Sequence, residues 1–168
     1  MELFGVLETT GTALFFLGSL LTIGLLAALA ATDLKKGLLP DKLTGALALC
    51  ALVLHMMGGS DLTNSLAGAM AAGGMLLFLR YISEGLCEEG ALGLGDVKLA
   101  AAGGLLLGLP HIMAALFIGA VIGMLHGLVL WRHSGTGVAL SKINVPAGLG
   151  LCIGIAIVWL MQYGFVMP

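Results

Sequence analysis

Long apolar runs, separated by short polar or glycine-rich breaks, follow one another along this chain. A helix needs about 20 mostly apolar residues to cross a bilayer, and fewer when other helices surround it. The pattern predicts six such helices, at residues 11–32, 43–58, 62–82, 97–109, 111–132 and 145–163. The expected fold is therefore all-α: a polytopic membrane protein with about six transmembrane helices.

The break between the fourth and fifth runs is the shortest, at Leu109-Pro110-His111. Proline is common in the first turn of a helix, so these residues fit a tight turn between two helices. A kink within one longer helix is the alternative and would leave five spans. We expect six.

Composition agrees with a chain that lies in a lipid bilayer. It is 60% hydrophobic and 10% charged, with a mean hydropathy of +1.12, whereas soluble domains carry about a quarter charged residues. The net charge of −2 and the lack of a basic patch argue against a nucleic-acid partner. Because no lysine or arginine precedes the first apolar run, we expect it to remain as an anchor rather than act as a signal peptide.

The basic residues predict an orientation. All of them lie in the first, third or fifth connection or at its borders: Lys35, Lys36, Lys42, Arg80, Lys98, Arg132 and Lys142. The positive-inside rule then places these connections in the cytoplasm and both termini outside. Four aromatic residues near the ends of the spans are expected at the membrane interface: Tyr81, Trp131, Trp159 and Tyr163.

Asp33 and Asp96 are the acids nearest the apolar core. Asp33 closes the first span and Asp96 opens the fourth, so both are expected at the cytoplasmic border. An ionisable residue beside a membrane core is costly, and this favours a functional role. The alternative is structural: Asp33 ends its helix and Asp96 is an N-cap, as Asp41 after Pro40 is expected to be for the second helix.

Two carboxyl groups on one side of a membrane are typical of aspartyl proteolysis. The reaction needs a pair that shares one proton, in which one group acts as base on a water and the other as acid. Asp33 is expected at the negative end of a helix, which favours the protonated acid, and Asp96 at a positive end, which favours the base. Gly93 and Gly95 carry no Cβ, so an extended substrate strand can approach the backbone before Asp96.

Small residues also recur at a spacing of about four: Gly104, Gly108, Ala115, Gly119, Gly123 and Gly127. Such stripes allow helix backbones to approach closely inside a membrane. We expect them to serve packing within the bundle. The alternative is a smooth face on the fifth span for a transmembrane helix of a substrate or of a second subunit.

Three stretches together resemble the type IV prepilin peptidases, bacterial members of the GxGD aspartyl proteases: Asp33 to Thr44, Gly93 to Gly103, and Pro146 to Gly150. The resemblance implies one transmembrane peptidase domain over residues 1–168, in the bacterial cytoplasmic (inner) membrane, with Asp33 and Asp96 as the catalytic pair. Five further residues are expected at the substrate: Gly93, Gly95, Asp41, Lys98 and Pro146.

The resemblance also implies the substrate, a prepilin or pseudopilin. Its short basic leader is cut at the cytoplasmic face, typically after a glycine and just before an apolar helix. Acids of the third connection are then expected to attract the leader: Glu84, Glu88 and Glu89. No metal or other cofactor is expected, since the histidines are dispersed and Cys50, Cys87 and Cys152 form no CxxC pair.

Two departures from the family pattern matter. Bifunctional members carry a zinc-binding insert with paired CxxC motifs, whereas only residues 34–42 separate Asp33 from the second span here. We therefore expect cleavage without N-methylation. The run at Pro146 reads Val-Pro-Ala-Gly-Leu, without the usual aromatic residue and second proline.

The alternative function is that of a non-catalytic membrane protein, either a pilin-binding scaffold or a small transporter subunit. Transporters place charged or broken segments near the middle of the bilayer, whereas the acids here lie at the borders of the spans. A family member that binds pilins without cutting them has the same sequence features. The peptidase hypothesis gives both aspartates a catalytic role.

Overall fold

A computed structural model describes residues 2–37, 39–58, 61–86, 93–133 and 147–164. These residues form six helices and no strand, which confirms the all-α prediction. The helices are α1 (Glu2–Lys36), α2 (Asp41–Gly58), α3 (Leu62–Leu86), α4 (Leu94–Leu107), α5 (Leu109–His133) and α6 (Ala147–Gly164).

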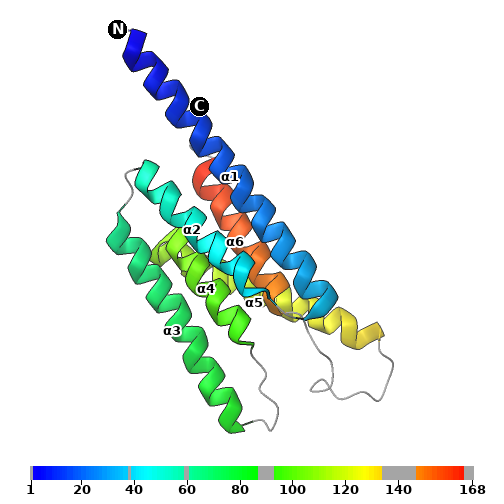
Figure 1. Cartoon of the computed structure of the whole chain (residues 1–168). Coiled ribbons are helices and arrows are strands. Elements are labelled where there is room, and N and C mark those ends of the chain that lie inside the picture. The colour runs from blue at the N-terminus through cyan, green and yellow to red at the C-terminus, as the bar shows by residue number, and fades with distance from the viewer. Residues whose placement is uncertain (1, 38, 59–60, 87–92, 134–146, 165–168) are drawn as a thin grey trace.

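Three helices contain segments that are long and apolar enough to cross a membrane, at Leu14–Lys35, Leu62–Gly85 and Leu109–Leu130. The apolar segment Ala147–Gln162 of α6 is shorter. Together with the two remaining helices, these segments describe a multi-pass membrane protein. The start of α1 and the end of α6 lie at the same end of the bundle (Figure 1).

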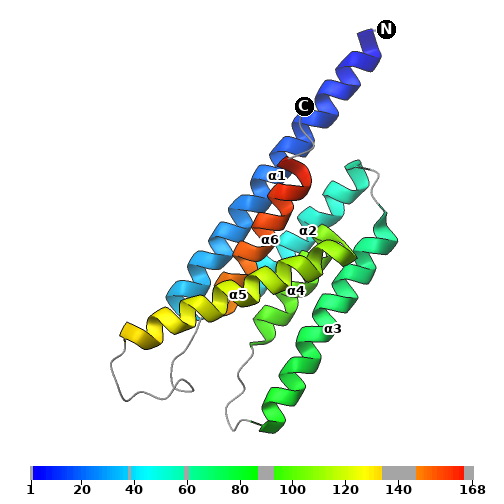
Figure 2. The same cartoon turned by 180° about the vertical axis from the view of Figure 1, so that it is seen from behind.

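The short helix α4 lies at the centre of the bundle. It contacts α2, α3, α5 and α6, and most of its side chains are buried. Its 14 residues span about 21 Å at 1.5 Å per residue, less than a bilayer core. Because the neighbouring helices surround it, this helix does not need the full length of a lipid-facing span. Helix α5 crosses the bundle obliquely beside α6 (Figure 2).

Helix α1 continues past Asp33 and ends at Lys36. Gly37 follows with a φ of 60°, and its N–H donates to the Asp33 carbonyl oxygen over 2.8 Å. A glycine in this left-handed conformation is a common helix stop, since it lacks the Cβ that strains other residues there. The alternative that Asp33 ends the helix is therefore wrong; Gly37 has that role.

Helices α4 and α5 are separate, as predicted, and a single kinked helix is excluded. The turn between them is centred on Gly108, which has a φ of 77° and whose N–H donates to the Gly104 carbonyl over 2.9 Å. Helix α5 then begins at Leu109, two residues earlier than expected. The sequence pattern assigned the turn to the proline, whereas the backbone turns at the glycine before it.

Glycines bring pairs of helices into backbone contact. A Cβ added at Gly68 of α3 would lie 2.7 Å from the Gly104 carbonyl oxygen of α4, and one at Gly119 of α5 would lie 2.9 Å from that of Gly150 in α6. At these crossings the small residues serve packing within the bundle. Gly123, by contrast, has no atom within 4 Å of an added Cβ.

The aromatic residues divide between core and surface. Trp159 is 2% exposed and belongs to the core, so its expected place at the membrane interface is wrong. Tyr81 is exposed on α3. The side chains of Trp131 and Tyr163 lie outside the described residues.

Candidate active site

The structure brings Asp33 and Asp96 into one region of the bundle. Asp33 lies in the last turn of α1 and Asp96 in the first turn of α4. The residues are 4% and 7% exposed, respectively. The two carboxyl groups are close enough for their charges to interact electrostatically. Two acids that are far apart in the sequence thus form one buried pair.

The N-terminus of α6 holds the carboxyl group of Asp33. The backbone N–H of Leu149 donates to Asp33 Oδ2 over 2.8 Å. A Cβ added at Gly148 would lie 2.9 Å from the same oxygen. The missing Cβ therefore lets the carboxyl group reach the first turn of α6. Reasoning from the sequence did not assign a contact to Gly148 or Leu149, although both lie in the third resembling stretch.

Asp96 is not an N-cap, because α4 begins earlier. Gly93 is the N-cap, with an extended backbone, and the N–H of Asp96 donates to the Gly93 carbonyl over 3.1 Å. Asp96 Oδ1 is buried and has no hydrogen-bond partner among the described residues. Buried polar atoms normally have partners. An unpartnered carboxyl oxygen therefore indicates a group that is kept available for water or substrate.

Helix dipoles do not distinguish the two acids. Asp33 lies at the negative end of α1, but its Oδ2 also contacts the positive end of α6. Asp96 lies at the positive end of α4. Both carboxyl groups thus meet a helix N-terminus, and the expected division into Asp33 as acid and Asp96 as base loses its physical basis.

Asp41 and Lys98, both expected at the substrate, form an ion pair with each other. Lys98 Nζ lies 2.7 Å from Asp41 Oδ1, and the two side chains are 51% and 72% exposed. The expected N-cap role of Asp41 is not seen, since Asp41 is already the first residue of α2. The pair links the starts of α2 and α4 beside Asp96.

The remaining predicted contacts lie at the edge of the described part of the chain. Gly93 and Gly95 precede Asp96 directly, as the sequence requires. Glu84 pairs with Arg80 over 2.6 Å, which leaves less of its charge for a basic leader. Pro146, Glu88 and Glu89 lie outside the described residues.

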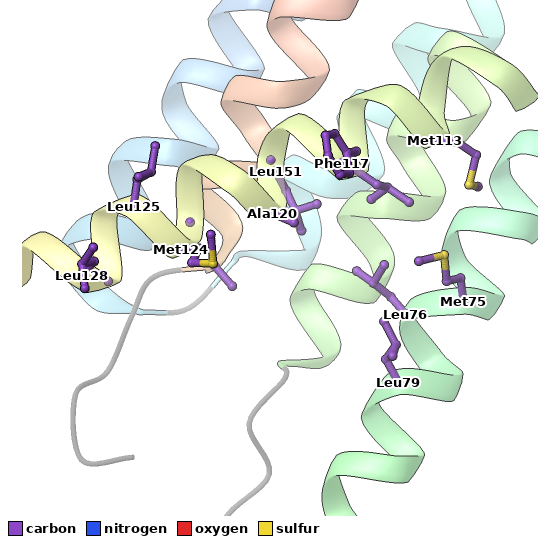
Figure 3. Close-up of a pocket in the computed structure, with 15 residues that line it drawn as sticks. Met75, Leu76, Leu79, Met113, Phe117, Ala120, Met124, Leu125, Leu128 and Leu151 are labelled. Carbon is purple, nitrogen blue, oxygen red and sulfur yellow. The ribbon is translucent and has the colours of Figure 1, made fainter. Parts of the chain in front are cut away.

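An apolar groove with a volume of about 880 Å³ opens between α3 and α5, with the start of α6 at its base. Figure 3 shows side chains of α3 and α5 facing one another across it. Its lining includes Met75, Leu79, Met113, Phe117, Met124 and Leu151. Two of the lining residues belong to α6, Ala147 and Leu151, and they flank the Gly148–Leu149 segment that contacts Asp33. The groove therefore reaches the same turn of α6 that binds Asp33.

The described residues contain no group of three or more histidine, cysteine, aspartate or glutamate side chains placed to hold a metal ion. Cys50 and Cys152 are free and buried. Within the described part of the chain, the site therefore consists of the two carboxyl groups with backbone and apolar neighbours.

Comparison with known proteins assigns the family. The type IV leader peptidase family model matches residues 20–128. The chain belongs to this family. The matched segment contains both Asp33 and Asp96, and membership of the type IV leader peptidase family confirms the resemblance seen in the sequence.

Several relatives carry the name prepilin leader peptidase/N-methyltransferase. The protein of Aeromonas salmonicida is 35% identical over 148 residues, covering 85% of this chain and 49% of the relative. That of Pectobacterium carotovorum is 34% identical over 129 residues, 76% of this chain and 45% of the relative. That of Neisseria gonorrhoeae is 31% identical over 130 residues, 74% of this chain and 46% of the relative. The chain thus spans about half the length of these type IV leader peptidase relatives. No solved structure matches it.

Proposed function

We propose that this protein is a membrane aspartyl endopeptidase that removes the leader peptide of a type IV prepilin or pseudopilin in the bacterial cytoplasmic membrane. The observation that carries the proposal is the buried, interacting pair of Asp33 and Asp96, one of which has an oxygen without a partner. Family membership supplies the reaction class and the relatives' names supply the substrate class.

In the proposed mechanism, the ionised carboxyl group takes a proton from a water held between the acids, and the water oxygen attacks the scissile carbonyl carbon. The protonated carboxyl group donates its proton to the carbonyl oxygen, which gives a neutral tetrahedral diol. Collapse of the diol breaks the C–N bond, returns a proton to a carboxyl group and passes another to the leaving amine. The Leu149 amide holds Asp33 in position through Oδ2.

We place the site at the cytoplasmic face and both termini outside. Lys35 and Lys98 lie at the same end of the bundle as the acid pair, in α1 and α4 respectively. Basic residues beside transmembrane segments are enriched on the cytoplasmic side. The leader peptide of the substrate would then reach the acid pair from the cytoplasm.

The apolar groove suits the helix that follows the cleaved bond. This helix has to begin at the acid pair and continue into the membrane, and the groove starts at Ala147 and Leu151 beside Gly148–Leu149. Part of its lining consists of small residues, namely Gly119, Ala120 and Gly123. Small residues allow a helix to approach closely. We therefore propose that the apolar helix of the substrate lies between α3 and α5.

We also propose that this chain does not methylate the new N-terminal amine of the cleaved pilin. The relatives' names include an N-methyltransferase activity. This sequence contains no CxxC pair, and α1 and α2 are joined by the short segment 37–40. The mass of the mature N-terminus, measured after co-expression with this chain alone, tests the proposal: an added methyl group contradicts it.

The test of cleavage is co-expression of a prepilin with the wild type, Asp33→Asn or Asp96→Asn, read by gel shift and terminal mass spectrometry. Each substitution is expected to lower cleavage by about 10²–10⁴-fold, because an acid–base group is lost. Asp61→Asn is the control, since Asp61 is an exposed acid that accepts hydrogen bonds from Thr63. Cleavage that survives either catalytic substitution contradicts the pair. Binding without cleavage by the wild type supports the scaffold instead.

The groove is tested by a photo-crosslinking residue introduced at Met124, which is 70% exposed. The matched control is Leu49, 64% exposed, in a second apolar groove of about 470 Å³ between α1 and α2. We expect crosslinks to the prepilin helix from position 124 and not from position 49. Lipid crosslinks alone at position 124, or equal prepilin crosslinks at both positions, contradict the assignment.

A further inference from the structure

Gly123 of α5 is a glycine that packing within the bundle does not explain. Among the described residues, no atom lies within 4 Å of a Cβ added to it, whereas one added at Gly119, one turn earlier, would lie 2.9 Å from the Gly150 carbonyl oxygen. Glycine inside a helix lowers the stability of that helix relative to alanine. The bundle therefore requires a glycine at position 119 but has room for a side chain at position 123.

The open space at Gly123 belongs to the groove between α3 and α5. Two other small residues on the same face of α5, Ala120 and Gly127, also line this groove. The larger side chains of Phe117 and Met124, which line the groove as well, are 72% and 70% exposed (Figure 3). Ala120, Gly123 and Gly127 thus form a notch beside these two large side chains, and we call it the Gly123 notch.

The Gly123 notch lies towards the acid pair. A Cβ added at Gly150 of α6 would lie 3.1 Å from the backbone nitrogen of Gly123. Leu149, the residue before Gly150, donates its amide hydrogen to Asp33 Oδ2. A helix rises about 5.4 Å per turn, so a substrate helix that begins at the acid pair reaches the notch within about two turns.

We propose that the Gly123 notch receives one large apolar side chain from the first two turns of the substrate helix. The inference rests on the proposed peptidase function. Tight packing of two helices needs a side chain of one to enter a space between side chains of the other, and between membrane helices such packing contributes to association. A larger residue at position 123 fills the notch and holds the substrate helix away from α5.

The first experiment measures kcat and KM for prepilin cleavage in detergent by the wild type, Gly123→Ala, Gly123→Leu and Gly74→Leu. Gly74 of α3 is the matched control, because a Cβ added there is equally open and Gly74 lines neither groove. Gly123→Leu should lower kcat/KM by about 10–200-fold, through a higher KM at unchanged kcat. Gly74→Leu should keep both constants.

Thermal unfolding of the same preparations provides the structural readout. Alanine and leucine favour a helix more than glycine does, and both positions are open. The unfolding midpoints of all three variants should therefore equal or exceed that of the wild type. A loss of substrate affinity without a loss of stability is not expected from a residue that only packs the bundle.

The second experiment shortens the substrate instead of the enzyme. Each large apolar residue in the first two turns after the cleaved bond is replaced by alanine, one at a time, and every prepilin is tested with the wild type and Gly123→Leu. For one substrate position, the penalty of Gly123→Leu should become smaller by at least about threefold, because the side chain that met leucine is gone. Such a double-mutant cycle detects direct contact between the two residues.

The outcomes separate this inference from the proposed function. If Gly123→Leu raises KM no more than Gly74→Leu does, or if no shortened prepilin reduces the penalty, the notch is not a contact and the inference is overturned. Loss of a dimer of this chain in Gly123→Leu, at unchanged KM, would assign the notch to a second copy and also overturn it. If Gly123→Leu does not fold, Gly123→Ala decides alone. If folded wild type cleaves no prepilin, the peptidase proposal itself fails.

Discussion

The buried polar groups at the two ends of the bundle differ in their hydrogen-bond partners. At the histidine end (His55, Ser65 and Leu105), His55 Nε2 lies 2.7 Å from the Leu105 carbonyl oxygen and 2.8 Å from the Ser65 hydroxyl. At the aspartate end (Asp33 and Asp96), Asp33 Oδ2 accepts one amide hydrogen, and Asp96 Oδ1 has no partner among the described residues. Both ends join helices through polar atoms, and among the described residues each leaves one buried polar atom without a partner: a ring nitrogen of His55 at one end and a carboxyl oxygen of Asp96 at the other.

The protonation of the groups explains the difference. A carbonyl oxygen can only accept, so Nε2 carries the proton that points to Leu105. The Nδ1 of His55 has no partner in the described part of the chain, and an uncharged ring nitrogen costs less to bury than a charged group. A carboxyl group without a partner costs more, and this favours a role in chemistry rather than in stability. The histidine end joins α2, α3 and α4, and the aspartate end serves the reaction.

The largest expected effect is a loss of cleavage without a loss of stability in the Asp96→Asn variant. Cleavage should fall by about 10²–10⁴-fold, while the midpoint of thermal unfolding in detergent stays the same or rises, because an amide cannot carry a buried charge. Cleavage of a co-expressed prepilin and a melting curve of the same preparation test this. A loss of several degrees would make Asp96 a structural residue and remove the contrast between the two ends.

The next largest effect is expected at the glycine contact immediately before Leu105. Gly104→Ala inserts a methyl group against the Gly68 backbone of α3 and should lower the free energy of unfolding by about 1–3 kcal/mol. Gly74→Ala is the matched control, since no atom lies within 4 Å of its added Cβ. Denaturant titration in mixed micelles measures both variants. Equal effects would contradict tight packing at the histidine end.

His55→Ala should be destabilising without a direct effect on the reaction. The loss of its buried hydrogen bonds is expected to cost about 1–2 kcal/mol, the upper range for helix contacts in membranes. The folded fraction should cleave prepilin at the wild-type rate, because His55 and Asp96 lie towards opposite ends of the bundle. His111→Ala, an exposed site, is the control. A lower rate per folded molecule would show that the two ends are coupled.

The smallest effect on stability is expected for the exposed pair of Asp41 and Lys98. Exposed ion pairs contribute about 0–1 kcal/mol, so Asp41→Asn, Lys98→Gln and the double variant should melt within that range of the wild type. If these residues contact substrate, KM should rise several-fold with kcat unchanged. A double-mutant cycle on both quantities distinguishes a structural pair from a substrate contact.

The sequence predicted much of the fold because its strongest signals are local. The apolar runs located six helices to within a few residues at most boundaries, although α1 begins well before residue 11. The predictions were wrong where the backbone conformation of a glycine determines where a helix ends. Gly37, not Asp33, ends α1, and Gly108, not Pro110, forms the turn before α5. Positive φ values at Gly37 and Gly108, two of the 27 glycines of the chain, have no distinct pattern in the sequence.

The sequence by itself determined the number of helices, the hydrophobicity of each, the family, and the two acids that merited attention. These properties depend on residue type and local spacing. The tertiary structure alone decided how the acids are held: Asp33 accepts the Leu149 amide 116 residues away, and Leu39 fills the space between Gly95 and Gly148. Such contacts depend on how close helix ends come in space, and hydropathy does not encode that distance because every span buries apolar residues in the same way.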